Sequence, residues 1–298
     1  MKLSQLKYFA AVAETGSFSL AAARCHVTQP TLSNGIAQLE ESLGGRLFER
    51  TTRTVSLSSY GAHMRPKISQ LLEDERELIV ASEAFRNPAR KILRMGMSPS
   101  ADYQRVNNIV GPFFAENPDY EVFCKECFLE DGENRLAPGQ LDVMIRPVRG
   151  SADAGRSMAP LYAELLLYVP KDCVGTTEPI DFADLAEDTF IMGPTGCGLL
   201  EIIQDMFLAH EVPLTLYPGQ ALSYVSMQEW ADIGMGATIL PASKLAGPSA
   251  NCARPIVLKD GKAAKISFAA EYISQPSQQT HIQAFHEFIR GAAGSVPI

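Results

Sequence analysis

The amino-acid sequence predicts an α+β multidomain protein in which a small, mainly helical N-terminal domain and a long helix precede a larger α/β domain. Within residues 1–43, apolar residues recur at helical spacing in three short runs, and a fourth helical pattern covers residues 59–85. After residue 91, segments typical of strands alternate with segments typical of helices, which indicates mostly parallel sheets covered on both faces. The 298 residues, 46% of them hydrophobic, suggest more than one domain. We expect domains at 1–58, 59–88 and 91–298.

The N-terminal domain is expected to contain three helices. The first covers residues 1–14, and a short Ala-rich helix follows from Ser19 to about Cys25. Thr28 can cap a third helix, with Pro30 in the first turn, where a missing N–H leaves no hydrogen bond unmade. The apolar stripe of this third helix is Leu32, Ile36, Leu39 and Leu43, and its opposite face carries Gln29, Thr31, Ser33, Asn34 and Gln38. Two helices with a short joint, the second polar on one face, predict a helix-turn-helix that reads the DNA major groove.

Residues 47–57 predict a short β-wing with Arg50 and Arg53 near its tip.

Over residues 17–53 the sequence resembles the LysR-type transcriptional regulators. The matching positions are Ala22, Ala23, Val27, Thr28, Gln29, Pro30, Thr31, Leu32, Ser33, Ile36, Leu39, Glu40, Leu43, Gly44, Leu47, Phe48, Arg50 and Arg53. The resemblance implies binding to double-stranded DNA. Expected base or groove contacts are Thr28, Gln29, Pro30, Thr31, Ser33 and Asn34, and Arg50 and Arg53 are expected at phosphates or the minor groove. Asn34 stands where many relatives carry Arg, and an amide suits adenine.

Charge is unevenly distributed along the chain. The net charge is −8, but residues 1–67 hold eight Lys and Arg against four Glu, a net of +4, which leaves −12 for the rest. A basic head on an acidic body confines phosphate contact to one end. No signal peptide opens the sequence, and no apolar run approaches the ~18 residues of a membrane span. We expect a cytoplasmic protein without a membrane partner, whose six cysteines are mostly reduced.

A long helix is expected to begin at Ser58 or Ser59 and to end near Phe85, before Asn87-Pro88. Apolar residues stand at heptad spacing in it, namely Met64, Ile68, Leu71, Leu78 and Phe85, although Glu75 and Ser82 interrupt the seam. The resemblance implies that this linker helix pairs two subunits; the alternative is a single helix packed on its own domain. Pro66 is expected to kink it.

The resemblance continues at residues 139–145 and 233–241 and therefore covers nearly the whole chain. It implies two Rossmann-like subdomains of the periplasmic-binding-protein type with a small effector in the cleft between them. The first subdomain is expected at about 91–162 and 266–298, and the second at about 163–265. The resemblance further implies a homodimer, further assembly into a homotetramer, and contact with RNA polymerase.

Candidate effector ligands stand where strands end and helices begin, because ligands bind beyond the carboxyl ends of strands in such sheets. They are Ser98, Ser100, Glu130, Arg146, Thr195, Gly196 and Cys197. Arg146 could pair with an effector carboxylate. The alternative for the serines is ordinary helix capping, and for Arg146 a surface salt bridge.

Cys197 opens a predicted helix, a position that lowers thiol pKa values, and it lies where the peroxide-sensing branch of the family is most similar. That branch needs a second thiol, but Met206 stands where the partner is expected. A redox-sensing regulator that uses Cys197 alone stays as an alternative. Cys124 and Cys127 have C-x-x-C spacing on a predicted strand, and no second Cys/His pair accompanies them, so no metal site is expected.

The sequence contains no G-x-S-x-G, H-E-x-x-H, phosphate-binding loop or dinucleotide fingerprint, so we expect neither catalysis nor a cofactor other than an effector of unknown identity. A solute-binding module shares the two-lobed fold, but the helix-turn-helix head argues against it. A regulator that responds to thiol oxidation or to a protein partner is a third possibility.

Overall fold

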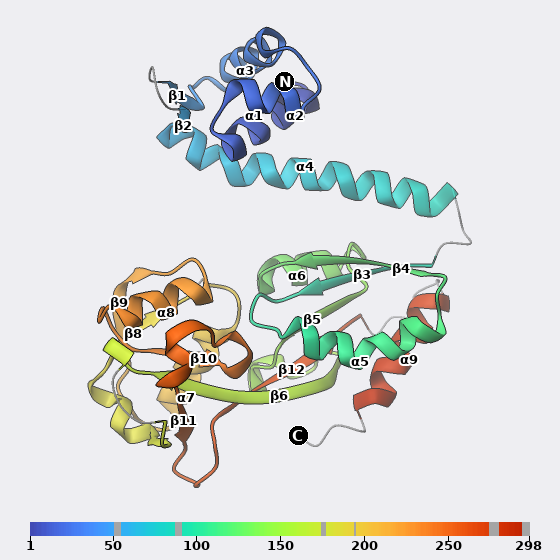
Figure 1. The fold of residues 1–298 in the computed structure, drawn as a ribbon. Helices are drawn as coiled ribbons and strands as arrows, with labels where there is room; N and C mark the ends of the chain where they lie inside the picture. Colours follow the sequence, from blue (N-terminus) through green and yellow to red (C-terminus); the bar gives the residue numbers. More distant parts are fainter. Residues whose placement is uncertain (51–54, 87–90, 174–176, 194, 274–279, 294–298) are drawn as a thin grey trace. The chain divides into compact units, whose positions relative to one another are not determined.

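The structure is a computed structural model that describes residues 1–298 except 51–54, 87–90, 174–176, 194, 274–279 and 294–298. The chain divides into two compact units, Met1–Ala89 and Arg90–Ile298, and each is described by itself (Figure 1). Among the described residues, no helix is long and apolar enough to cross a membrane.

Unit 1 begins with three helices, α1 (Leu3–Thr15), α2 (Phe18–Arg24) and α3 (Gln29–Leu43). The starts of α2 and α3 have a local cause, because Ser17 accepts a hydrogen bond from the Leu20 N–H and Thr28 accepts one from the Thr31 N–H. The prediction that Thr28 caps α3 is confirmed. The largest side chains of the core are fully buried, namely Phe9, Leu32, Ile36, Leu39 and Leu47.

The wing and the long helix complete unit 1. Strands β1 (Phe48–Arg50) and β2 (Val55–Leu57) pair antiparallel, as expected, and α4 (Ser59–Arg86) runs for 28 residues with Pro66 inside it. Ile68 is buried in the core of unit 1, whereas Leu78 and Ile79 are 71% and 50% exposed. The first half of α4 therefore packs on its own domain, which was the alternative interpretation. Toward the second half, Leu71, Leu78 and Ile79 form an apolar stripe on α4 that is exposed in the described part of unit 1.

Unit 2 is built on one large sheet of order β4-β3-β5-β12-β6-β11-β7, with β10 also paired to β6. Its strands are β3 (Lys91–Met97), β4 (Tyr120–Glu126), β5 (Val143–Pro147), β6 (Met158–Val169), β7 (Ile180–Asp181), β10 (Thr238–Pro241), β11 (Arg254–Val257) and β12 (Lys265–Glu271), and β8 (Thr189–Met192) and β9 (Thr215–Gln220) form a second, parallel pair. The helices are α5 (Tyr103–Glu116), α6 (Leu129–Leu136), α7 (Leu199–Ala209), α8 (Tyr224–Asp232) and α9 (Thr280–Ala293).

Figure 1 shows two lobes in unit 2, with β6 and β12 running between them. The first lobe holds β3 to β5, α5, α6 and α9, and the second holds β7 to β11, α7 and α8. Strands β6 and β12 pair antiparallel because one leaves the first lobe and the other returns to it. The expectation of mostly parallel sheets is right for β3, β4 and β5 and wrong around β6, whose neighbours β10, β11 and β12 are all antiparallel to it.

A buried histidine gives unit 2 a pH-dependent stability. His286 of α9 is 9% exposed, its Nε2 lies 3.0 Å from the Asp142 carbonyl oxygen, and its ring stacks on Tyr272. Burial lowers the pKa of His286 below its ordinary value of 6.5. The imidazole of His286 therefore binds a proton more readily in the unfolded chain than in the folded one. Its contribution to the free energy of unfolding is fully present above pH 6.5 and is lost as the pH falls below that value. We expect His286→Gln to flatten the decline in thermal midpoint between pH 7 and 5; an unchanged slope would contradict this origin.

Candidate functional site

The polar face of α3 is an exposed row of uncharged hydrogen-bonding groups. Thr28, Gln29, Pro30, Thr31 and Asn34 are exposed, and Ser33 is half-buried. The Thr28 and Thr31 hydroxyls lie 2.8 Å apart, and the Ser19 hydroxyl of α2 lies 3.5 Å from Gln29 Oε1. No Lys or Arg stands in α3 to compete with these groups. The face therefore offers hydroxyl and amide groups of the kind that read base edges.

One edge of the polar face of α3 is fixed by its packing on α1. A Cβ at Gly35 would lie 2.7 Å from the Tyr8 ring, which explains a glycine inside a helix. Gln5 Nε2 donates to Gln38 Oε1 at 2.9 Å, so α1 also holds the amide of Gln38. These contacts fix the rotation of α3 and, with it, the residues that face outward.

The base of the wing is tied to the end of α3. The Leu47 N–H donates to Glu40 Oε1 at 2.7 Å, and the Tyr60 hydroxyl donates to the Leu43 carbonyl at 2.7 Å. Arg50 ends β1, but its side chain and the whole of Arg53 lie outside the described residues. The expectations for these two arginines stay predictions.

In unit 2, an open cleft of about 490 Å³ lies where the two lobes meet. Its lining residues are Phe128, Glu130, Asp131, Asn134, Thr195 and Gly196. The Leu129 N–H donates to the Gly196 carbonyl at 2.8 Å, which joins the start of α6 to the loop before α7. Of the residues expected at an effector site, Glu130, Thr195 and Gly196 therefore come together in one cleft.

Ser98 and Ser100 do not line this cleft. Both are fully buried, their hydroxyls lie 2.8 Å apart, and they donate to the Cys197 carbonyl at 2.9 and 3.3 Å. They join the end of β3 to the loop of the second lobe. In this structure their role is to hold the lobes together.

Cys197 is also buried, at 2% exposure, and the Tyr224 hydroxyl lies 3.4 Å from its sulfur. Burial raises the pKa of Tyr224, so this hydroxyl stays protonated and can donate to the sulfur. A thiol enclosed in this way is shielded from oxidants in solution, because reactive cysteines are generally exposed in part.

Lys244 forms a further tie between the lobes that sequence reasoning missed. Its ammonium donates to the Ala101 carbonyl at 2.6 Å and lies 5.2 Å and 5.8 Å from the ring centroids of Tyr103 and Tyr224. Burial lowers the pKa of Lys244. Nothing in the sequence around Lys244 points to these partners, because the rings and the carbonyl come from distant segments.

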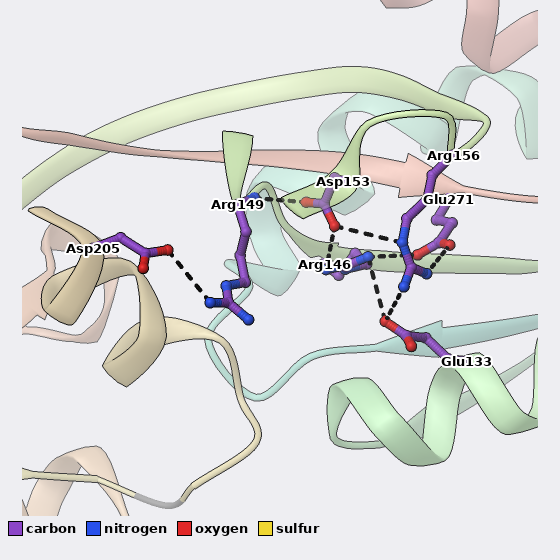
Figure 2. A network of polar contacts seen from close by, with 7 residues as sticks. All are labelled: Glu133, Arg146, Arg149, Asp153, Arg156, Asp205 and Glu271. Carbon is purple, nitrogen blue, oxygen red and sulfur yellow. Dashed lines mark hydrogen bonds and ion pairs between the residues drawn. The ribbon is translucent and has the colours of Figure 1, made fainter. Parts of the chain in front are cut away.

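Arg146 lies inside a network of charges and does not line the cleft (Figure 2). Its side chain is 2% exposed and pairs with Asp153 at 2.9 Å, Glu271 at 2.8 Å and Glu133 at 3.6 Å. Arg156 pairs with Glu271 at 2.7 Å and Glu133 at 3.1 Å. Protein carboxylates thus pair with the guanidinium that was expected to meet an effector, and the pairs of Arg146 with Asp153 and Glu271 are buried, unlike the surface salt bridge of the alternative.

Among the described residues, no group of three or more His, Cys, Asp or Glu side chains is placed so that it could hold a metal ion. Cys25, Cys124, Cys127 and Cys197 are free thiols, and burial raises the pKa of Cys127 to about 11. Cys124 is exposed on β4 whereas Cys127 is buried beyond the end of the strand.

Two family models match the chain and together span most of it. The model described as "Bacterial regulatory helix-turn-helix protein, lysR family" matches residues 3–62, and the model "LysR substrate binding domain" matches residues 86–294. The first covers α1 to the start of α4, and the second covers unit 2 with its cleft.

Individual relatives agree with these models. The chain is 29% identical to the uncharacterized HTH-type transcriptional regulator YnfL of Escherichia coli K12, over 82% of this chain and 83% of YnfL. It is 28% identical to the DNA-binding transcriptional dual regulator OxyR of the same strain, over 81% of this chain and 79% of OxyR. Its fold is similar to the crystal structure of CbnR, a LysR family transcriptional regulator, with a TM-score of 0.62, 21% identity, and coverage of 98% of this chain and 99% of CbnR.

Proposed function

The chain belongs to the LysR family of bacterial regulatory proteins, and from this premise we propose how its two sites divide the work of transcriptional control. It is a DNA-binding regulator with an effector-binding domain. In our proposal, α3 reads base edges and the cleft of unit 2 binds the effector. The observation that carries the first part is the exposed row of hydroxyl and amide groups on α3, held outward by the packing of Gly35 and Gln38 on α1.

The effector site of the proposal is the cleft lined by Glu130, Thr195 and Gly196. Residues from both lobes line it, so a ligand there changes the contacts between lobes. Such a ligand biases an equilibrium between two conformations only to the extent that it binds one of them better. In our proposal this bias alters DNA contact and the approach of RNA polymerase.

The proposal includes assembly of two or more copies. DNA-binding regulators of this architecture present paired heads to a partly palindromic site. The exposed apolar stripe of α4 supports pairing through this helix, and further assembly into a tetramer joins unit 2 to other copies. In this scheme the protein acts in the cytoplasm, on DNA, and carries out no catalysis.

A thiol-based response is the second candidate function. It is favoured by the similarity to OxyR over 81% of the chain. The burial of Cys197 and its contact with Tyr224 speak against direct oxidation, and Met206 occupies the position where a second thiol is expected. Binding of a small-molecule effector in the cleft therefore has stronger support than a thiol-based response.

A substitution of Gln29 directly tests whether the polar face of α3 reads base edges. We select a DNA site from a random pool with the wild-type protein. We expect Gln29→Ala to weaken binding to this site by about five- to 150-fold, because a lost amide–base pair corresponds to roughly 1–3 kcal/mol. Binding to random DNA depends on phosphate contacts and should stay unchanged. Gln104→Ala, an exposed amide on α5, is the matched control. Equal losses on selected and random DNA in a gel-shift titration would refute base reading by Gln29.

A further inference from the structure

The side chains that line the cleft carry charge of one sign only. Glu130 and Asp131 are acidic, and no Lys, Arg or His is among the lining residues. Asp131 pairs with Arg135 of the same helix at 2.9 Å, which offsets its charge. Glu130 is exposed, and no described residue bonds or pairs with its carboxylate. An uncompensated carboxylate therefore faces the space that a ligand would fill.

The arginines of the charge network around Arg146 do not line the cleft and do not reverse this charge. Arg146 and Arg156 are enclosed by Glu133, Asp153 and Glu271, so two positive charges meet three negative ones (Figure 2). Arg149, on the other side of this view, points to Asp205 with 3.4 Å between Nη2 and Oδ2. Each arginine drawn in Figure 2 thus has its carboxylate within the protein. Arg146 Nε and Arg149 Nε are buried without a partner among the described residues, but neither arginine lines the cleft.

Aromatic and carbonyl groups in the same region suit a cation. Phe128 lines the cleft with 42% of its surface exposed, and aromatic faces attract ammonium groups. One such group is already present nearby, since the Lys244 ammonium lies on the Tyr103 and Tyr224 rings and donates to the Ala101 carbonyl. The Tyr224 hydroxyl contacts Cys197, the neighbour of Gly196 in the cleft wall. The boundary between the lobes therefore already holds one ammonium against aromatic rings.

We propose that the effector of this regulator carries a protonated amine, which the Glu130 carboxylate binds beside the Phe128 ring. This inference rests on the proposed function, in which the cleft is the effector site. Acidic residues in the first turn also stabilise a helix through its dipole, and Glu130 can do so for α6. That role changes the stability of α6, whereas amine selectivity changes ligand affinity, so the two are measured separately.

The test is a calorimetric titration of the full chain at millimolar concentrations of matched probes. Phenethylamine is compared with 3-phenylpropionate, butylamine with butyrate, and phenylalanine supplies both charged groups. We expect the amines to bind and the carboxylates without an amine not to bind. Binding that is confined to the carboxylates, or the absence of binding by every amine, overturns the proposal.

Charge variants of the cleft sharpen the result. Glu130→Gln should weaken amine binding about threefold to tenfold, and Asn134→Asp should strengthen it, because both change the charge and keep the shape. Glu187→Gln, an exposed carboxylate outside the cleft lining, is the control and should have no effect. If neither Glu130→Gln nor Asn134→Asp changes the affinity for amines, the result contradicts the proposal.

A blocking variant separates this inference from the proposed function. Asn134→Trp fills the cleft from the exposed side of α6. If carboxylates bind and this variant abolishes their binding, the cleft is the effector site but the amine assignment is wrong. If amines bind and neither Glu130→Gln nor Asn134→Trp changes their affinity, the ligand lies elsewhere and both proposals fail.

Discussion

Replacing Arg146 by Ala is expected to lower the free energy of unfolding of unit 2 by about 3–5 kcal/mol, because it leaves buried carboxylates without their cation. The side chains of Asp153 and Glu271 are 5% and 10% exposed, so both carboxylates would lose their cation where bulk water solvates them poorly. Arg156 remains beside Glu271 at 2.7 Å and places the expected loss toward the lower end of this range. Chemical denaturation of the full chain measures the change.

The control for Arg146 is a pair of the same chemistry at the surface. Arg105 lies 3.2 Å from Asp102 and is 46% exposed, so Arg105→Ala should change stability by less than about 1 kcal/mol. Neutral partners should rescue the buried site, so Asp153→Asn with Glu271→Gln is expected to restore part of the stability lost in Arg146→Ala. The deficit should also shrink at acidic pH, where the abandoned carboxylates take up protons. A loss below about 1 kcal/mol in Arg146→Ala would show that the network contributes little.

The helices of the head could be predicted from the sequence because their signals are local. The cap at Thr28, the proline that follows it and the apolar stripe from Leu32 to Leu43 all lie within one helix and its first turn. In the middle of this helix, a Cβ at Gly35 would meet a close neighbour. That this neighbour is Tyr8 of α1 depends on tertiary packing, and only the structure shows it.

The sequence predicted which loops form the candidate effector site, but it did not predict which side chains of those loops line it. Strand ends identified the loops that meet in the cleft, because ligands of α/β folds bind beyond the carboxyl ends of strands. The choice between lining the cleft and lying beneath it depends on distant partners. Ser98 bonds to a carbonyl 99 residues away, and Arg146 bonds to a carboxylate 125 residues away. No local pattern carries that information, and the same limit concealed the contacts of Lys244.

The second half of α4 provides the other large effect. We expect Leu78→Glu to convert the assembly to monomers and to weaken binding to a DNA with two half-sites about a hundredfold or more, because two linked heads bind far more tightly than one. Leu78 is 71% exposed in the single chain, so its replacement should leave the stability of unit 1 unchanged. In an assembly paired through α4, the glutamates introduced in the two copies would place like charges in the apolar contact between the helices. Each carboxylate would also lose the water that solvates it.

Two comparisons isolate this effect from a general loss of binding. Ser69 is exposed and lies nine residues, or two and a half helical turns, before Leu78, on the opposite face of α4, so Ser69→Glu adds the same charge away from the seam. This control should stay assembled in sedimentation velocity and bind DNA as the wild type does. Leu78→Glu should bind a single half-site with unchanged affinity, because α3 is untouched. A Leu78→Glu protein that remains assembled would show that copies pair through another surface, and the exposed stripe of α4 would then need a different partner.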